Sequence, residues 1–374
     1  MARVHRLRLA AMAAVSLLLA SAPVMAATGG PTVVGQVAMP GTPIAVAVSP
    51  SGDQVYVIAG PNLVATRADN LQEAWSTPLP RVAEDVAVHP SGSTIYAGGG
   101  RSLSVIDADS GVIKRTFTVM AGVHALAVTP DGRQLWVMSR GPKANLTVED
   151  TAAGTNAGAI TVLDTRTSKV IDTIGLGPIP QDILMSPSGA RVYVLGWGSD
   201  SIWIINAKSR TVMSKIKVRP WPEAMALNPA GSRLLVSHSP PGVQSSYAVT
   251  TINTEKRAIT GVFRHPEDLA ALAINQSDLV VGEGWLRPGE ALIGLSESLS
   301  SLDYRPGLVM INMKTQQTAA TVPVNPPCDG LTGQVSMAVS RDTTRAYVIT
   351  ECIAGSGVLT AMDLGGQPDE PASS

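Results

Sequence analysis

The chain has 374 residues, and its 28 Lys and Arg nearly balance its 29 Asp and Glu. This near-neutral charge argues against a general nucleic-acid binder, which needs a basic surface. Aromatic residues make up only 4% of the chain, whereas 35 Gly and 27 Pro require many turns. The composition therefore disfavours a helical bundle and favours short strands.

The amino terminus has the pattern of a secretory signal peptide. Three arginines precede an uncharged apolar run over residues 9–22, which is too short to span a bilayer comfortably. Val24 and Ala26 are the small residues expected before a cleavage site, so we predict a signal peptide at 1–26. A buried amino-terminal helix is the alternative. The mature chain of about 348 residues then carries a net charge of about −4, and we expect an exported monomer without a transmembrane segment.

An internal repeat follows the signal peptide. Each copy is an apolar strand, a Pro-Ser-Gly or Pro-Asp-Gly turn, and a second apolar strand, as in IAVAVSPSGDQVYVI from Ile44. Pro presets φ for such a turn and Gly accepts a positive φ. Five further copies begin at Glu84, His124, Gln181, Glu223 and Val335, and a weaker one begins at Ala271. A third and a fourth strand follow in most copies, as in LSVIDADSGVIKRTFTV from Leu103.

The spacing of the copies predicts the fold. Equivalent turn positions lie 40 to 65 residues apart, and a period near 40 with four strands per unit is typical of a β-propeller. The last copy lacks a fourth strand, and the segment Thr32–Met39 has no sheet of its own. We therefore predict an all-β, seven-bladed propeller of four-stranded antiparallel blades over 27–364. The amino-terminal strand closes the last blade and hides exposed strand edges, and residues 365–374 form a disordered tail.

The repeat blocks also resemble a known family. AVSPSGDQVYV and LMSPSGARVYVL, followed by blocks such as VLDTRTSKVIDTIGLG, are similar to the YVTN family of seven-bladed propellers over residues 32–364. The resemblance implies the architecture and not an activity, because these blocks are the blade scaffold itself. Similar propellers include surface-layer proteins, periplasmic binding proteins, lactonases, lyases and subunits of cofactor-dependent dehydrogenases.

All the excess length over the repeat falls in loops on one face of such a propeller. The turns between first and second strands and between third and fourth strands are short everywhere. The insertions occupy the other face, at 139–158, 238–248, 283–307 and 351–357. Long loops on one side of a rigid scaffold usually carry binding, although neutral drift of surface loops is the alternative.

Polar residues open the first strands of four successive blades, at the mouth of the central channel on the loop-rich face. They are Glu84, His124, Gln181 and Glu223, and Asp182 follows directly after Gln181. Two carboxylates that flank a histidine suit a divalent cation such as Ca²⁺ or Mg²⁺, or an acid and base around a polar substrate. The alternative is the polar lining of any hydrated channel.

Further candidates lie at or near the same rim. His265 belongs to a His-Pro-Glu-Asp turn, and Trp197, Trp221 and Trp285 are placed to stack against a planar or sugar-like ligand. Common loop chemistry and packing between blades are the alternatives. Cys328 and Cys352 flank two antiparallel strands of the last blade, so in an exported chain we predict a disulfide between them.

Two functions remain open. The first is an extracytoplasmic propeller that binds a small molecule, a protein partner or a surface polymer on its loop-rich face. The second is a propeller enzyme, similar to lactonases or lyases, with His124 as general acid or base and with Glu84 and Glu223 as its partners or as metal ligands. The two are distinguished by whether these side chains converge in a closed pocket or surround an open channel.

Overall fold

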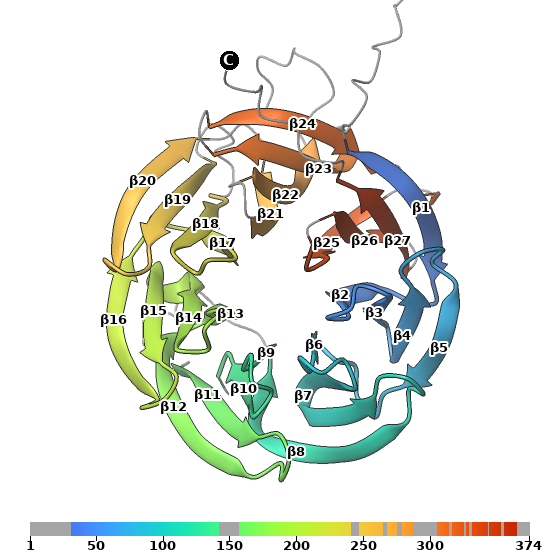
Figure 1. Cartoon of the computed structure of the whole chain (residues 1–374), viewed down its shortest axis with the longest axis horizontal. Coiled ribbons are helices and arrows are strands. Elements are labelled where there is room, and N and C mark those ends of the chain that lie inside the picture. Colours follow the sequence, from blue (N-terminus) through green and yellow to red (C-terminus); the bar gives the residue numbers. More distant parts are fainter. Residues whose placement is uncertain are drawn as a thin grey trace, which may run out of the picture.

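The computed structural model describes residues 31–141, 157–240, 247–264, 268–274, 279–286, 305–313, 316–324, 327–328, 331–342, 344–352 and 355–364. They form seven antiparallel sheets around a central axis, with the first strand of each repeat innermost (Figure 1). The chain is therefore an all-β propeller. The predicted signal peptide and carboxy-terminal tail lie outside the described residues. Within the described ranges, no helix is long and apolar enough to cross a membrane.

Six sheets have four strands. In repeat order the first five are β2 (Pro43–Val48), β3 (Gln54–Ala59), β4 (Asn62–Arg67) and β5 (Glu73–Pro78); β9 (Ala125–Val128), β10 (Gln134–Ser139), β11 (Ala157–Asp164) and β12 (Val170–Pro178); β13 (Pro180–Met185), β14 (Arg191–Gly196), β15 (Ser201–Asn206) and β16 (Thr211–Lys217); β17 (Pro222–Leu227), β18 (Arg233–His238), β19 (Ala248–Asn253) and β20 (Ala258–Arg264); and β21 (Asp268–Ile274), β22 (Leu279–Leu286), β23 (Arg305–Asn312) and β24 (Gln317–Pro323). The sixth joins β25 (Leu331–Val339), β26 (Arg345–Cys352) and β27 (Ser356–Asp363) to β1 (Thr32–Met39).

The remaining sheet has three strands, so the prediction of seven four-stranded blades is wrong by one. It consists of β6 (Asp85–Val88), β7 (Thr94–Asp107) and β8 (Ile113–Val123). The 14-residue β7 covers the positions of a second and a third strand. Three successive glycines, Gly98 to Gly100, join the two positions, and Gly100 takes a positive φ of 54° there, which glycine tolerates.

Burial explains why the repeats form these strands. The second strands, such as β3, β14 and β18, are continuous apolar runs that are buried on both faces. The fourth strands, such as β5 and β16, alternate between exposed and half-buried residues, because they form the outer edge of each blade. The sequence of each repeat therefore orders its strands from the inside of the disc to its rim.

The hydrophobic core is divided among the junctions between sheets. Each of the seven clusters of buried residues draws its members from two neighbouring sheets. One of them packs Met39, Val57 and Tyr347 together, so the first and last sheets share a core of the same kind as the other neighbours. The strand β1 also pairs with β27 along its whole length, from Thr32 opposite Asp363 to Met39 opposite Gly357.

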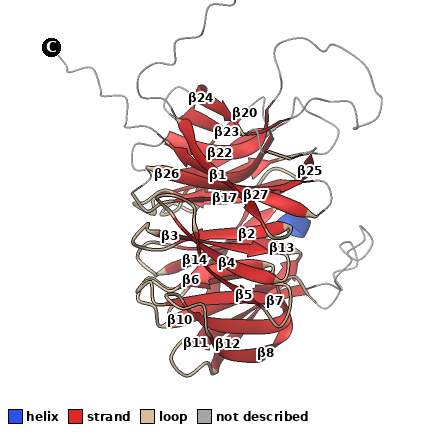
Figure 2. Cartoon of the chain, turned by 90° about the vertical axis from the view of Figure 1, so that its right-hand side faces the viewer, coloured by secondary structure: helices blue, strands red, loops and turns tan. Residues whose placement is uncertain are grey.

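The repeated turn motif locks neighbouring blades together on the face of the short turns. Gly189 and Gly231 take positive φ values of 70° and 71°. A Cβ on either would stand 3.1 and 3.0 Å from the ring of the preceding blade's turn proline, Pro130 and Pro187 respectively. The turn glycine is thus required both for its backbone conformation and for the close approach of that proline. Figure 2 shows the short helix η1 (Trp197–Ser199) at the opposite face of the disc.

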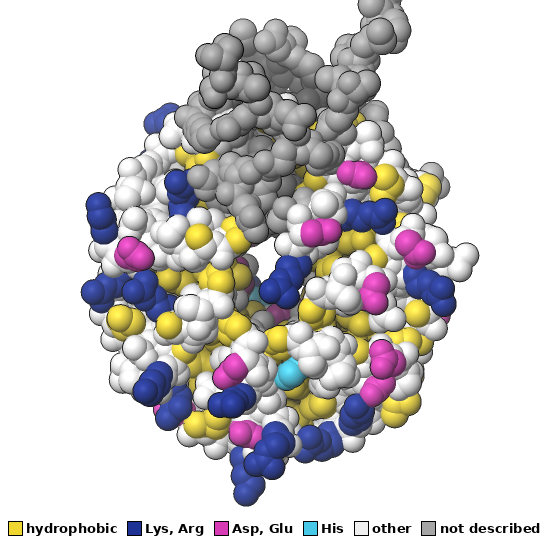
Figure 3. Space-filling model, in the orientation of Figure 1, with side chains coloured by type: hydrophobic (Ala, Val, Ile, Leu, Met, Phe, Trp, Pro, Cys, Tyr) yellow, Lys and Arg dark blue, Asp and Glu magenta, His cyan; other side chains and the backbone are white. Residues whose placement is uncertain are grey.

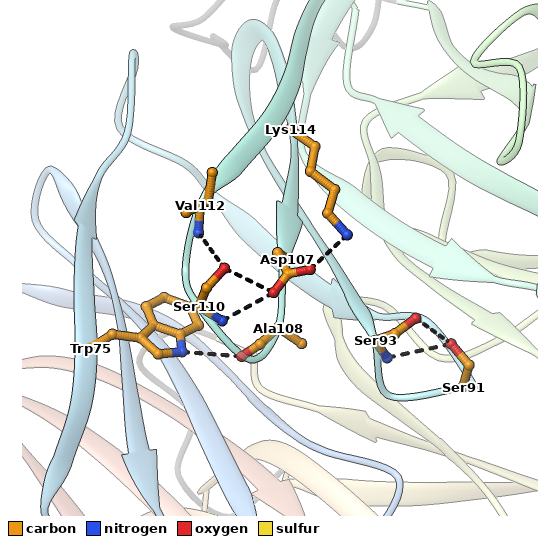
Figure 4. A network of polar contacts seen from close by, with 8 residues as sticks. All are labelled: Trp75, Ser91, Ser93, Asp107, Ala108, Ser110, Val112 and Lys114. Carbon is orange, nitrogen blue, oxygen red and sulfur yellow. Dashed lines mark hydrogen bonds and ion pairs between the residues drawn. The ribbon is translucent and has the colours of Figure 1, made fainter.

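Polar contacts join the blades at their outer edge as well (Figure 4). Trp75 in β5 donates from Nε1 to the carbonyl oxygen of Ala108, at 3.0 Å, in the turn before β8. In that turn, Asp107 accepts hydrogen bonds from Ser110 and forms a 2.6 Å ion pair with Lys114. The turn at 107–111 therefore supports the packing of two blades.

The predicted disulfide is present. Cys352, at the end of β26, is bonded to Cys328, and their Cα atoms are 6.1 Å apart. The bond ties the segment before β25 to the sheet that also contains β1. Such a bond persists in an oxidising environment, so it fits an extracellular protein.

Candidate functional site

A histidine joins predicted mouth residues from three successive sheets. His124, directly before β9, has Nδ1 3.1 Å from Oε2 of Glu84 and Nε2 3.1 Å from the main-chain carbonyl oxygen of Gln181. Figure 3 shows acidic and histidine side chains inside the hollow at the centre of the disc. The structure thus brings Glu84, His124 and Gln181 together, as the positions of their strands predicted.

Both ring nitrogens of His124 are engaged by the protein. The carbonyl oxygen of Gln181 can only accept, so Nε2 donates to it. The hydrogen bond from His124 holds the pKa of Glu84 below its ordinary value, against the opposing effect of burial, and the charges of His124 and Arg140 lower it further. Glu84 is therefore an ionised acceptor at neutral pH. In this arrangement neither nitrogen of His124 is directed at a substrate, and the ring connects blades.

Arg140 is a site residue that the sequence analysis did not single out. It directly follows β10, its guanidinium donates to the side-chain oxygen of Gln181, and it is half-buried. Burial lowers its pKa, while the charges of Glu84 and Glu223 act in the opposite direction. Its Nε is buried and has no hydrogen-bond partner in the part of the chain that the structure describes. The available signal was its place, at the start of the insertion 139–158 beside the predicted mouth.

Two further carboxylates connect the inner strands. Asp85 accepts hydrogen bonds from the main-chain N–H of Val86, at 2.8 Å, and of Leu126 in the next sheet, at 2.7 Å. Burial raises the pKa of Asp85 to about 7, and the charges of Asp182 and Glu84 raise it further, against those two hydrogen bonds. Asp182 occupies the equivalent place two sheets later, and burial raises its pKa too. These acids are parts of the scaffold, and burial shifts both of them toward their neutral, protonated form.

An aromatic pair belongs to the same two blades as Gln181 and Glu223. The ring centroids of Trp197 and Trp221 are 5.1 Å apart in a T-shaped arrangement with an interplanar angle of 71°. Trp197 lies in η1, and its N–H donates to the carbonyl oxygen of Ile179, two residues before Gln181. Trp221 lies two residues before Glu223 and is 38% exposed. We name this pair the tryptophan ledge.

The structure describes no side chain for two other predicted site residues, His265 and Trp285. His265 lies outside the described residues. Trp285 is in β22 opposite Asp268, in a region where only the backbone is described. Among the described residues, no three His, Cys, Asp or Glu side chains gather as a metal ion would require, so the donors present do not form a complete ligand set.

Two cavities lie on the opposite face, between blades, and three charged residues of the larger one are hydrogen-bonded within the fold. The larger, of about 580 Å³, includes Asp53, Asp342 and Arg345. Asp53 accepts from Ser49 and Ser51, Asp342 accepts from Ser340 and Thr344, and Arg345 donates to the carbonyl oxygen of Ala68. The mouth, with its buried and unpartnered Arg140 Nε, is therefore the better candidate site.

No protein-family model and no curated protein matches the chain, so its membership of the YVTN family remains a prediction.

Proposed function

We propose that the protein is an exported, closed propeller of the YVTN type, in which the three-stranded sheet β6–β8 counts as a blade and brings the total to seven. We further propose that it binds a ligand at the channel mouth on its loop-rich face. The observation that carries the binding proposal is Arg140. Its guanidinium feels the charges of Glu84 and Glu223, and its buried Nε–H has no partner among the described residues; a buried polar group in that condition is costly unless an acceptor reaches it. A ligand oxygen supplies that acceptor.

The test combines a ligand screen with a matched pair of variants. A small-molecule library is screened by thermal shift, because a ligand that binds only the folded state raises the melting temperature. We expect the shift produced by a true ligand to be lost in Arg140→Gln. It is kept in Arg210→Gln, which removes an arginine paired with Asp172 at the outer edge. Hits that act equally on both variants would refute binding at the mouth.

The alternative is a lactonase- or lyase-like enzyme that uses His124 with Glu84, and the 3.1 Å contact between them is the observation in its favour. Against it, Nε2 of His124 is occupied by Gln181. If this alternative holds, the protein hydrolyses a lactone or catalyses an elimination, and His124→Gln abolishes that activity. If the enzyme also depends on a metal, calorimetric titration with Ca²⁺ or Mg²⁺ gives a heat of binding that Glu84→Gln and Glu223→Gln abolish. If titration of the unmodified protein with these ions releases no heat of binding, the metal-dependent form is excluded.

A further inference from the structure

We infer that the tryptophan ledge and the polar mouth form a binding site for a neutral glycan, with one pyranose ring against Trp221. This inference names the ligand class of the proposed function and rests on it.

The exposure of Trp221 is what distinguishes it from its counterpart in the preceding blade. Ile179 occupies the equivalent position before a proline, has a similar positive φ of 47° against 59° for Trp221, and is 4% exposed. The unusual backbone conformation therefore belongs to the scaffold, since it recurs. The exposed aromatic side chain of Trp221, by contrast, is not required by the scaffold, because the same position in the neighbouring blade buries a smaller side chain.

The ledge is held in place by one acidic residue. The N–H of Asp200 donates to the carbonyl oxygen of Trp197, at 3.4 Å, and its side chain accepts from the N–H of Trp221, at 3.3 Å. A second contact fixes the other side of Trp221, whose carbonyl oxygen accepts from the N–H of Ser239 at 3.0 Å. These hydrogen bonds fix the main chain that carries both rings. Less conformational entropy is therefore lost when a ligand binds.

The neighbouring polar groups suit hydroxyl groups. A sugar ring has apolar C–H faces, which stack on an aromatic ring, and hydroxyls that both donate and accept. Glu223 follows Trp221 by two residues and offers carboxylate acceptors, whereas Arg140, bonded to Gln181, offers N–H donors. The charges of Glu84 and Glu223 offset that of Arg140, so the mouth has no net positive charge to attract an acidic sugar.

Isothermal titration calorimetry tests this with defined oligosaccharides. The probes are hexasaccharides of glucose, N-acetylglucosamine, xylose, mannose and galacturonic acid, titrated into the full chain. We expect at least one neutral hexasaccharide to bind and the galacturonic acid hexasaccharide not to bind. Trp221→Ala is expected to weaken the neutral ligand at least ten-fold, and Trp221→Phe to retain affinity within about three-fold, because the stacking face is kept.

The matched control is Met213→Ala. Met213 is also an apolar residue with 38% exposure, but it lies on the outer strand β16. Its variant should bind as the unmodified protein does. Equal binding by Trp221→Ala, or no binding by any neutral hexasaccharide, overturns the inference. If a ligand from the thermal-shift screen nevertheless requires Arg140, the proposed function stands without the glycan. If no ligand depends on Arg140 either, both fail.

Discussion

At the scale of single residues, polar side chains around the channel act as connectors between blades. Asp85 reaches the main chain of Leu126 in the next sheet, and His124 reaches both a preceding and a following sheet. Inner strands of a propeller converge on one axis, so their unpaired N–H and C=O groups need partners from neighbouring blades. Part of the polar ring is therefore structural. Arg140 differs from the connectors because its Nε–H has no acceptor among the described residues.

His238 makes folding sensitive to acid. It is 2% exposed, Nδ1 donates to the carbonyl oxygen of Pro220 at 3.3 Å, and Nε2 accepts from the hydroxyl of Thr250 at 2.8 Å. Burial lowers the pKa of His238 to about 4, from an ordinary 6.5. Between those values the unfolded chain binds the proton and the folded chain does not, so stability falls as pH falls from 6.5 to 4.

The measurement is urea unfolding at pH 7, 5.5 and 4 for the unmodified protein and His238→Gln. His238 is expected to lower the free energy of unfolding by up to about 3 kcal/mol between pH 7 and 4, and the variant should not show this loss. Parallel pH profiles for the two proteins would contradict a buried neutral histidine.

Asp85 is expected to act in the opposite direction. Its pKa of about 7 in the folded protein lies above the ordinary 3.8. Between pH 4 and 7 the folded protein therefore holds a proton that the unfolded chain has lost, and this group's contribution to stability decreases as pH rises. The free energy of unfolding of Asp85→Asn, compared with the unmodified protein over this range, should show the unmodified protein losing stability relative to the variant. A constant difference would refute the raised pKa.

At the scale of elements, each blade is held by turns and by bonds between them. In six sheets, the residue after the third strand, or after β7 in the three-stranded sheet, donates its N–H to a carbonyl in the turn between the first two strands. The pairs are Ala68 to Asp53, Ala108 to Ser93, Thr165 to Arg133, Ala207 to Ala190, Thr254 to Ser232 and Leu364 to Thr344. This bond ties the two short turns of a blade to each other and explains why neither turn accepts insertions.

Gly231→Ala is expected to destabilise the propeller. Its φ of 71° is unfavourable for alanine, and the new Cβ would stand 3.0 Å from Pro187. We expect a loss of about 1–3 kcal/mol in the free energy of unfolding. Gly261→Ala is the control, because a Cβ there meets nothing within 4 Å and its φ is ordinary for an L-residue. Equal effects of the two substitutions, measured by urea unfolding, would contradict the interlocking of proline and glycine.

At the scale of the whole molecule, the first strand of the described chain belongs to the same sheet as the last. The pairing of β1 with β27 covers what would otherwise be an exposed edge of the last sheet. Met39 contributes its side chain to the cluster shared by the first and last sheets, and Cys328–Cys352 braces the same sheet. Because every core cluster lies between two sheets, an opening at this junction exposes apolar surface on both.

Met39→Ala tests that junction. Met39 is 5% exposed, so its truncation is expected to lower the free energy of unfolding by about 2–4 kcal/mol. Val34 on the same strand is 49% exposed, and Val34→Ala should change stability by no more than about 0.5 kcal/mol. Chemical denaturation of both variants gives the comparison. A tolerated Met39→Ala would mean that β1 contributes little to the last blade.

Much of the architecture was predictable because its signals are local and repeated. The apolar strands and their Pro-Ser-Gly or Pro-Asp-Gly turns specify a blade within about 40 residues. The three-stranded sheet was not predictable from these signals, because Gly98 to Gly100 look like an ordinary glycine-rich turn. At the mouth, the residues that open the inner strands were predictable from their register. Arg140 was not, because it reaches the mouth from the end of a second strand.

The sequence by itself determined the all-β repeat, the short turns, the disulfide pair and the positions of Glu84, His124 and Gln181 around one axis, since periodicity and turn chemistry act within each repeat. Only the tertiary structure decided how those side chains are used. Hydrogen bonds between blades engage both nitrogens of His124 and bury Asp85, while Arg140 keeps an unpartnered N–H. These properties depend on distances between residues 40 or more positions apart, which no local pattern fixes.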